Sequence, residues 1–154
     1  MHYRLYQPGD FARLYAIEEL CFPPALRFGR RYMRKLIQSR ASATWIAEND
    51  GAMTGFAIVE WTLDPGYESA YIPTLEVSPD YRRRGIGVEL LRRLERSAIN
   101  AGAALIWLHV DAANEAAIRL YQAEGYELRG RHEHYYARHQ AAEVYLKPLA
   151  PPGG

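Results

Sequence analysis

Hydrophobic and polar positions divide the chain into seven segments of strand character and four of helical character. Alternating or continuous apolar runs predict strands at residues 3–6, 44–47, 55–59, 70–77, 104–110, 126–130 and 143–149. Apolar residues at helical spacing predict helices over about 11–21, 30–39, 87–101 and 114–124. The resulting order, βααβββαβαββ, is typical of an α/β (α+β) domain with a mixed sheet and helices on both of its faces.

Turn-forming residues mark the ends of these elements. Asp10 is placed to cap the first helix, and Phe22-Pro23-Pro24 ends it because proline cannot donate a backbone hydrogen bond. Asp50-Gly51 predicts a tight hairpin between the second and third strands. Asn114 is placed to cap the last helix.

Length and charge limit the classes of protein to consider. The 154 residues carry 19 Lys and Arg against 18 Asp and Glu, a formal net charge of +1. A chain of this length buries one core without disulfides, so we expect a single domain over 1–149 and a disordered Pro- and Gly-rich tail over 150–154. The charge balance gives no global attraction to nucleic acid or to an anionic membrane, and neither is an expected partner.

Cysteine and histidine usage adds two expectations. Cys21 is the single cysteine and cannot form an intramolecular disulfide, and no signal peptide or membrane-spanning run is apparent, so we expect a cytoplasmic protein. His132, His134 and His139 have no cysteine or carboxylate at ligand spacing. We therefore expect exposed histidines there and no metal.

The segment Arg82-Arg83-Arg84-Gly85-Ile86-Gly87 joins a predicted strand to a predicted helix. Unpaired N–H groups at a helix start attract anions, and glycine lets a ligand approach the backbone closely. Leu90 replaces the third glycine of a dinucleotide-binding fingerprint, so that motif is not present. The residues alone fit a phosphate site and a tight turn with solvated charges about equally well.

Two longer segments resemble one known family. Residues 71–87 are similar to the strand and loop of the GNAT superfamily of acetyl-CoA-dependent N-acetyltransferases, whose loop motif is [QR]-x-x-G-x-[GA]. Residues 114–126 resemble its N-x-x-A-x-x-[LF]-Y-x-x-x-G-[FY] signature, and the order of elements agrees. The resemblance covers nearly the whole chain. It implies the GNAT fold, with a mostly antiparallel central sheet of about seven strands, and acetyl-CoA as co-substrate.

The resemblance also implies the residues that bind and use acetyl-CoA. The loop and helix start would hold the pyrophosphate, with Arg82, Arg83, Arg84, Gly85, Ile86, Gly87 and Val88. The backbone at Leu75 and Val77 would pair with the pantetheine arm. Asn114 and Ala117 would contact CoA, and Tyr121 would lie beside the thioester sulfur as the acid that protonates the thiolate. From the residues alone, Asn114 is a helix cap and Tyr121 a core aromatic.

Three residues on the predicted strands are candidate bases: Tyr71, Glu76 and His109. Strand alternation places Trp107, His109 and Asp111 on one face, and an imidazole has a near-neutral pKa suited to proton transfer. The residues alone slightly favour a half-buried histidine without a catalytic role.

A finer resemblance concerns the same strands. Tyr71 and His109 resemble the catalytic pair of eukaryotic-type protein N-terminal acetyltransferases, which act through an ordered water. Bacterial ribosomal-protein-alanine acetyltransferases usually have glutamate and arginine where His109 and Asp111 stand, and this chain departs from them at both positions.

Two aromatic motifs bear on the acceptor. Phe22-Pro23 and Tyr135-Tyr136 resemble the two loops that form the walls of the peptide groove in N-terminal acetyltransferases. Together they favour a peptide or protein N-terminus, with direct transfer in a ternary complex. Acetylation of a small amine and a non-catalytic acyl-CoA-binding module remain alternatives, as do a monomer and a homodimer.

Overall fold

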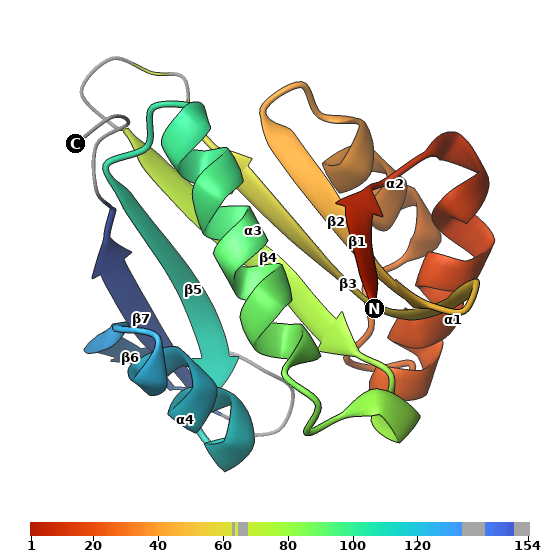
Figure 1. The fold of residues 1–154 in the computed structure, drawn as a ribbon. Coiled ribbons are helices and arrows are strands. Elements are labelled where there is room, and N and C mark those ends of the chain that lie inside the picture. Colours follow the sequence, from red (N-terminus) through yellow and green to blue (C-terminus); the bar gives the residue numbers. More distant parts are fainter. Residues whose placement is uncertain (63, 65–67, 134–140, 150–154) are drawn as a thin grey trace.

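The computed structural model describes residues 1–62, 64, 68–133 and 141–149, which form a seven-stranded sheet and four α-helices (Figure 1). The strands are β1 (His2–Leu5), β2 (Ser42–Asn49), β3 (Ala52–Trp61), β4 (Ser69–Val77), β5 (Leu105–Asp111), β6 (Glu127–His132) and β7 (Ala142–Pro148). The helices are α1 (Phe11–Cys21), α2 (Arg30–Gln38), α3 (Ile86–Asn100) and α4 (Glu115–Ala123). This confirms the predicted order of elements.

The strands lie in the order β1-β2-β3-β4-β5-β7-β6. Of the strand pairs within the described residues, β4 and β5 are parallel and the other five are antiparallel. The long helix α3 connects the two parallel strands, as a parallel pair requires a crossover. The sheet is therefore mixed and mostly antiparallel, as expected.

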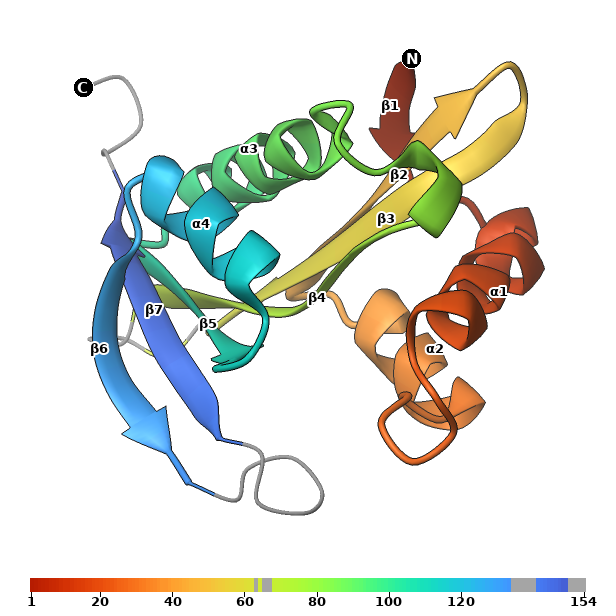
Figure 2. The same ribbon diagram turned by 90° about the horizontal axis from the view of Figure 1, so that it is seen from below.

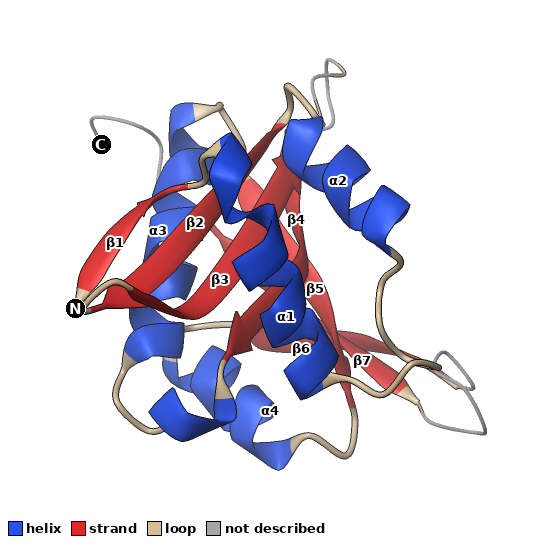
Figure 3. Cartoon of the chain, turned by 90° about the vertical axis from the view of Figure 1, so that its right-hand side faces the viewer, coloured by secondary structure: helices blue, strands red, loops and turns tan. Residues whose placement is uncertain are grey.

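Helices cover both faces of the sheet, and each pair encloses its own apolar core. Figure 2 shows α3 and α4 on one face and α1 and α2 on the other, and Figure 3 shows α1 and α2 in front of β2, β3 and β4. Leu90, Leu91 and Leu94 of α3 are fully buried in the first core. Leu14 and Met33 are fully buried in the second, against Phe56 of β3.

The turns follow the sequence signals with one exception. Asp50 (φ 51°) and Gly51 (φ 83°) both have positive φ, as the hairpin between β2 and β3 requires. The expected cap by Asp10 is wrong, since its side chain forms no capping hydrogen bond within the described residues of α1. Its carboxylate instead accepts from the Gln7 backbone (2.7 Å) and from the guanidinium of Arg4 (2.7 and 2.8 Å). A cation on β1 outcompetes the helix start because the bidentate ion pair is the stronger bond.

Strands β4 and β5 separate in the middle of the sheet. They pair over Ser69–Ile72, after which β5 continues beside β7 as far as Asp111. At the point of separation Ile72 and Pro73 together stand opposite the single residue Val59, which is a β-bulge. Proline suits that place because it has no N–H to donate to a neighbouring strand.

The bulge also changes the face to which side chains point. Ile72, before the bulge, belongs to the core beneath α3. Beyond it, Leu75 and Val77 lie close to Gly87 at the start of α3, whereas Glu76 turns toward α1. The burial pattern of β4 alternates without a break, so the change of face leaves no trace in the hydrophobic pattern.

Gly55 on β3 gives a direct test of how closely β3 and β4 pack. A β-carbon at Gly55 would lie 2.7 Å from the backbone oxygen of Glu76, so Gly55→Ala must push the strands apart. We expect the free energy of unfolding, measured by urea denaturation, to fall by about 1–3 kcal/mol.

Gly9→Ala is the matched control, because a β-carbon there meets no atom of the described residues within 4 Å. The free energy of unfolding of Gly9→Ala should stay within about 0.5 kcal/mol of the wild-type value. Equal effects of the two substitutions would contradict the close packing at Gly55.

Candidate active site

A cavity of about 270 Å³ lies where β4 and β5 separate. Residues from both faces of the sheet line it: Phe22, Leu26, Phe28 and Glu18 from α1 and the segment after it, Tyr71–Leu75 from β4, Leu108–Asp111 from β5, and Asn114, Ala117 and Tyr121 from α4 and its start. The gap between the strands thus connects the α1 side of the sheet with the α4 side. Two reactants entering from opposite faces could meet there.

Two of the predicted catalytic residues are in direct contact. Tyr71 Oη and His109 Nδ1 are 2.8 Å apart and share a hydrogen bond. As predicted, His109 lies on the face opposite the buried Ile106, Leu108 and Val110. Its ring also lies near the ring of His132 on β6, at 5.2 Å between centroids.

The electrostatic environment of His109 favours its neutral form. Partial burial, and secondly the charge of the nearby His132, lower the pKa of His109 below 6.5. A neutral imidazole at physiological pH can accept a proton. His132 is exposed, as expected from the sequence, and it also lowers the pKa of His109.

The α4 side of the cavity contains the third predicted catalytic residue. Tyr121 is 8% exposed, lines the cavity and packs edge-on against Tyr126. Asn114 caps α4 as predicted, since its Oδ1 accepts from the Ala117 N–H at 3.1 Å. The cap fixes the start of the helix that carries Tyr121.

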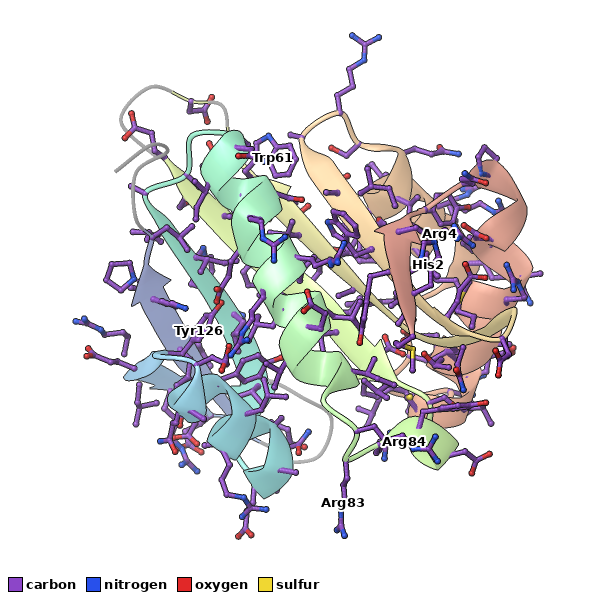
Figure 4. The ribbon with its side chains drawn as sticks, in the orientation of Figure 1. His2, Arg4, Trp61, Arg83, Arg84 and Tyr126 are labelled. Carbon is purple, nitrogen blue, oxygen red and sulfur yellow. The ribbon has the colours of Figure 1, made fainter. Side chains whose placement is uncertain are left out.

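The arginine–glycine turn forms the start of α3. Arg83 (φ 64°) and Gly85 (φ 79°) both have positive φ, and Gly85 directly precedes the helix. No side chain of the described residues caps α3, which leaves its first backbone N–H groups for an external partner. Figure 4 shows Arg83 extending away from the protein beside this end of α3.

A ligand can approach the backbone at Gly85, because an added β-carbon there would meet no atom of the described residues within 4 Å. The Arg84 guanidinium lies over the Tyr81 ring, and no ion pair within the described residues involves Arg82, Arg83 or Arg84. At Gly87, the side chain of Leu120 lies so close to the backbone that an added β-carbon would be 3.1 Å from it. Ile86 is buried and Val88 follows in the first turn. The turn is therefore a basic site with free N–H donors, which suits a phosphate group.

The remaining predicted residues differ in how they relate to the cavity. Phe22 lines it, and the carbonyl of Pro23 accepts from the Leu26 N–H in the turn after α1. Glu76 is 3% exposed on the α1 side and is not among the residues that line the cavity. Tyr135-Tyr136 and the tail lie outside the described residues.

The structure adds Glu18, Leu26 and Phe28 to the cavity wall. Sequence analysis assigned them no role. For Glu18 a signal existed, because it is an acid on the apolar stripe of α1 that contains Leu14 and Ile17. Nothing local marks Leu26 or Phe28.

Two further observations concern the described residues as a whole. They contain no group of three or more His, Cys, Asp or Glu side chains arranged to hold a metal ion. Within the same residues, no helix is both long and apolar enough to cross a membrane.

Comparison with known proteins identifies relatives of this arrangement. Residues 11–126 match the model of the acetyltransferase (GNAT) family. The chain is 38% identical over 87 residues to the ribosomal protein bS18-alanine N-acetyltransferase of Escherichia coli K12, 56% of each protein, and thus spans about half the length of that relative. It is 27% identical over 154 residues to N-alpha-acetyltransferase 50 of Danio rerio, covering 96% of this chain and 90% of the relative.

A solved structure extends the likeness over the whole chain. The crystal structure of the ribosomal-protein-S18-alanine N-acetyltransferase from Escherichia coli superposes with a TM-score of 0.86 and 26% sequence identity. The match covers 99% of this chain and 96% of that one.

The effect of His132 on His109 can be measured without a substrate. His132→Asn removes the Coulombic effect of His132 on His109, so we expect the pKa of His109 to rise toward 6.5 while burial still holds it below that value. An NMR titration of the His109 ring protons gives this pKa. His2→Asn, on β1, is the control and should leave it unchanged; an unchanged pKa in His132→Asn would disprove the coupling.

Proposed function

The chain belongs to the acetyltransferase (GNAT) family, and on this premise we propose that it transfers the acetyl group of acetyl-CoA to the N-terminal α-amine of a peptide or protein. One observation carries the proposal. The hydrogen-bonded pair Tyr71–His109 and the hydroxyl-bearing Tyr121 line the same cavity, which reaches the α1 side and the α4 side of the sheet. The proposed enzyme thus has a proton acceptor for the amine and a proton donor for the leaving sulfur.

The α4 side suits the acetyl donor. The free N–H groups at the start of α3 and the arginines beside them fit the diphosphate of CoA. Leu75 lines the cavity where β4 has left β5, so its backbone is free to pair with an extended ligand. Bound acetyl-CoA supplies the thioester that is attacked.

The α1 side suits the amine. A protein α-amine has a pKa of about 7.7–8.0, so roughly a tenth of it is neutral at pH 7, whereas a lysine amine near 10.4 is almost wholly charged. A neutral imidazole such as that of His109, whose pKa is lowered by burial and which is hydrogen-bonded to Tyr71, is a sufficient base for such an acceptor. The amine loses its proton to this pair and attacks the acetyl carbon, and Tyr121 protonates the sulfur as the carbon–sulfur bond breaks.

The relatives support a protein acceptor. The bacterial relative is named as a ribosomal protein bS18-alanine N-acetyltransferase, which specifies a protein acceptor. The Danio rerio relative is named as an N-alpha-acetyltransferase, which specifies an α-amine. Phe22, Leu26 and Phe28 give the acceptor side of the cavity an apolar wall against which a first side chain can pack. We propose a peptide N-terminus rather than a free small amine on these grounds.

The acceptor class is tested by acetylation assays with acetyl-CoA. We expect saturable acetylation of peptides with free α-amines and none of the same peptides when the α-amine is blocked, even where they contain lysine. A panel of small amines is assayed in parallel. Saturation by small amines alone would contradict the proposed acceptor.

The role of Tyr121 is tested by Tyr121→Phe, which removes the proposed acid but keeps the ring. We expect kcat to fall by about 100-fold or more and the Kd for acetyl-CoA to stay within about threefold. Tyr126→Phe is the matched control, because the Tyr126 hydroxyl donates to Glu95 and does not line the cavity. Equal kcat values for wild type and Tyr121→Phe would remove Tyr121 from this role.

A further inference from the structure

Two buried carboxyl groups, of Glu18 on α1 and Glu76 on β4, lie side by side beneath the cavity. Glu18 is 1% exposed and Glu76 is 3% exposed, and the two carboxyl groups lie close enough for Glu18 to raise the pKa of Glu76. One oxygen of each is satisfied: Glu18 Oε2 accepts from the Phe28 N–H at 2.9 Å, and Glu76 Oε2 accepts from the hydroxyl of Thr74. Within the residues that the structure describes, neither glutamate has a cation as its hydrogen-bond donor.

The other oxygens of this pair lack a donor. Among the described residues, Glu18 Oε1 and Glu76 Oε1 are two of three buried side-chain atoms without a hydrogen-bond partner. Two ionised carboxylates can accept hydrogen bonds but not donate them, so side by side they repel each other and leave both oxygens unsatisfied. A single proton converts one carboxylate into a donor that can hydrogen-bond to the other carboxylate.

The electrostatic surroundings of Glu76 also favour one proton on the pair of carboxyl groups. Burial, and then the hydrogen bond and charge of Glu18, raise the pKa of Glu76 to about 10. Among the described residues, Arg82, from the turn before α3, and Cys21 on α1 are charged or titratable groups that interact with the pair. The Arg82 guanidinium donates to the Val77 carbonyl and to Cys21 Sγ, and within the described part of the chain it forms no hydrogen bond with Glu18 or Glu76.

The contact between Glu18 and Glu76 connects the apolar wall on the acceptor side of the cavity, which includes Phe28, to β4, the strand that carries Tyr71. α1 holds Phe28 by both of its backbone groups, because Glu18 accepts from its N–H and Tyr15 Oη donates to its carbonyl at 2.7 Å. Phe28 and Glu18 line the cavity. The position of Glu18 relative to β4 therefore fixes the distance between this wall and Tyr71.

We propose that Glu18 and Glu76 share one proton in the folded enzyme, and that this hydrogen bond is a positioning element for acceptor binding. The positioning role rests on the proposed function, whereas the shared proton does not. In this role Glu18 and Glu76 do not touch the reacting atoms. They hold the wall that the acceptor packs against.

The shared proton is tested by the pH dependence of folding in wild type and Glu76→Gln. Glu76 is protonated when folded and ionised when unfolded between about pH 4.5 and 10, so wild-type unfolding releases a proton and its stability falls as pH rises through this window. The amide introduced by Glu76→Gln can donate to Glu18 and accept from Thr74 without a proton. We expect the ratio of the wild-type to the Glu76→Gln folding constant, from urea denaturation at pH 6, 7 and 8, to fall about tenfold per pH unit.

Glu95→Gln is the matched control for a buried carboxyl group. Glu95 accepts from Lys147 Nζ (3.1 Å) and from Tyr126 Oη (2.7 Å), so it needs no proton to satisfy its oxygens. The ratio of the wild-type to the Glu95→Gln folding constant should not show that fall. A ratio for Glu76→Gln that is independent of pH would overturn the shared proton.

The positioning role is tested by comparing Glu76→Ala, which leaves Glu18 Oε1 without a donor, with Glu76→Gln. In Glu76→Ala we expect the KM for an acceptor peptide to rise about fivefold while the KM for acetyl-CoA changes less than twofold, and in Glu76→Gln the acceptor KM to return toward the wild-type value. The exchange rate of the Phe28 amide hydrogen, measured by NMR, reports the same wall without any substrate and should rise in Glu76→Ala alone. Unchanged exchange and unchanged acceptor KM in Glu76→Ala would overturn the role.

The two proposals fail in distinguishable ways. Absence of peptide acetylation by the wild-type protein would refute the proposed function, and the folding and exchange measurements would still decide the carboxyl pair. Peptide acetylation with a pH-independent folding ratio would refute the shared proton and leave the proposed function standing.

Discussion

The separation of β4 from β5 is the constraint on which the site depends. A parallel pair that stayed joined would close the sheet, and the cavity between Tyr71 and Asp111 would be filled by backbone hydrogen bonds. The bulge at Ile72–Pro73 and the missing N–H of proline end the pairing on the β4 side, while β7 holds β5 in place on the other. The opening is thus bounded by two strands that are themselves firmly paired, which keeps its width fixed.

Because the opening passes through the sheet, each face can perform one part of the reaction. The face covered by α3 and α4 has the basic turn with free N–H donors and Tyr121. The face covered by α1 has the apolar wall and, on the neighbouring strands, the Tyr71–His109 pair. Anion binding and removal of the amine proton are kept on opposite faces, and the arginines near Gly85 are not among the groups that shift the pKa of His109.

Buried acids in this protein are satisfied in two different ways. Glu95 is paired with Lys147 and receives the hydroxyl of Tyr126, so its charge is balanced inside the core. Glu18 and Glu76 have no such cation as a donor among the described residues. Burial of two charges without compensation is costly, and in the proposed arrangement a proton takes the place of one. The second arrangement links two elements of the site and makes their relative position depend on a proton.

Local rules were enough for much of the fold and for part of the site. Periodicity predicted the order of the helices and strands. Asp50-Gly51 predicted the hairpin between β2 and β3, and Asn114 predicted the cap of α4. These features could be predicted because each of them depends on residues that are adjacent along the chain. Strand alternation placed His109 on its face for the same reason. The basic glycine turn could be located, although its residues alone did not distinguish a phosphate site from a plain turn.

Tertiary structure decided what depends on contacts between distant segments. The bulge that turns Glu76 toward α1 is set by the register of β4 against β3, and it leaves the burial pattern of β4 unchanged. The approach of His132 to His109, and of Glu18 to Glu76, joins residues from separate elements whose spacing in sequence carries no signal. Asp10 was misassigned because Arg4, on another element, forms a stronger bond with it than the helix start does. The sequence by itself determined the elements and the chemistry they carry, and the packing of those elements determined which groups meet.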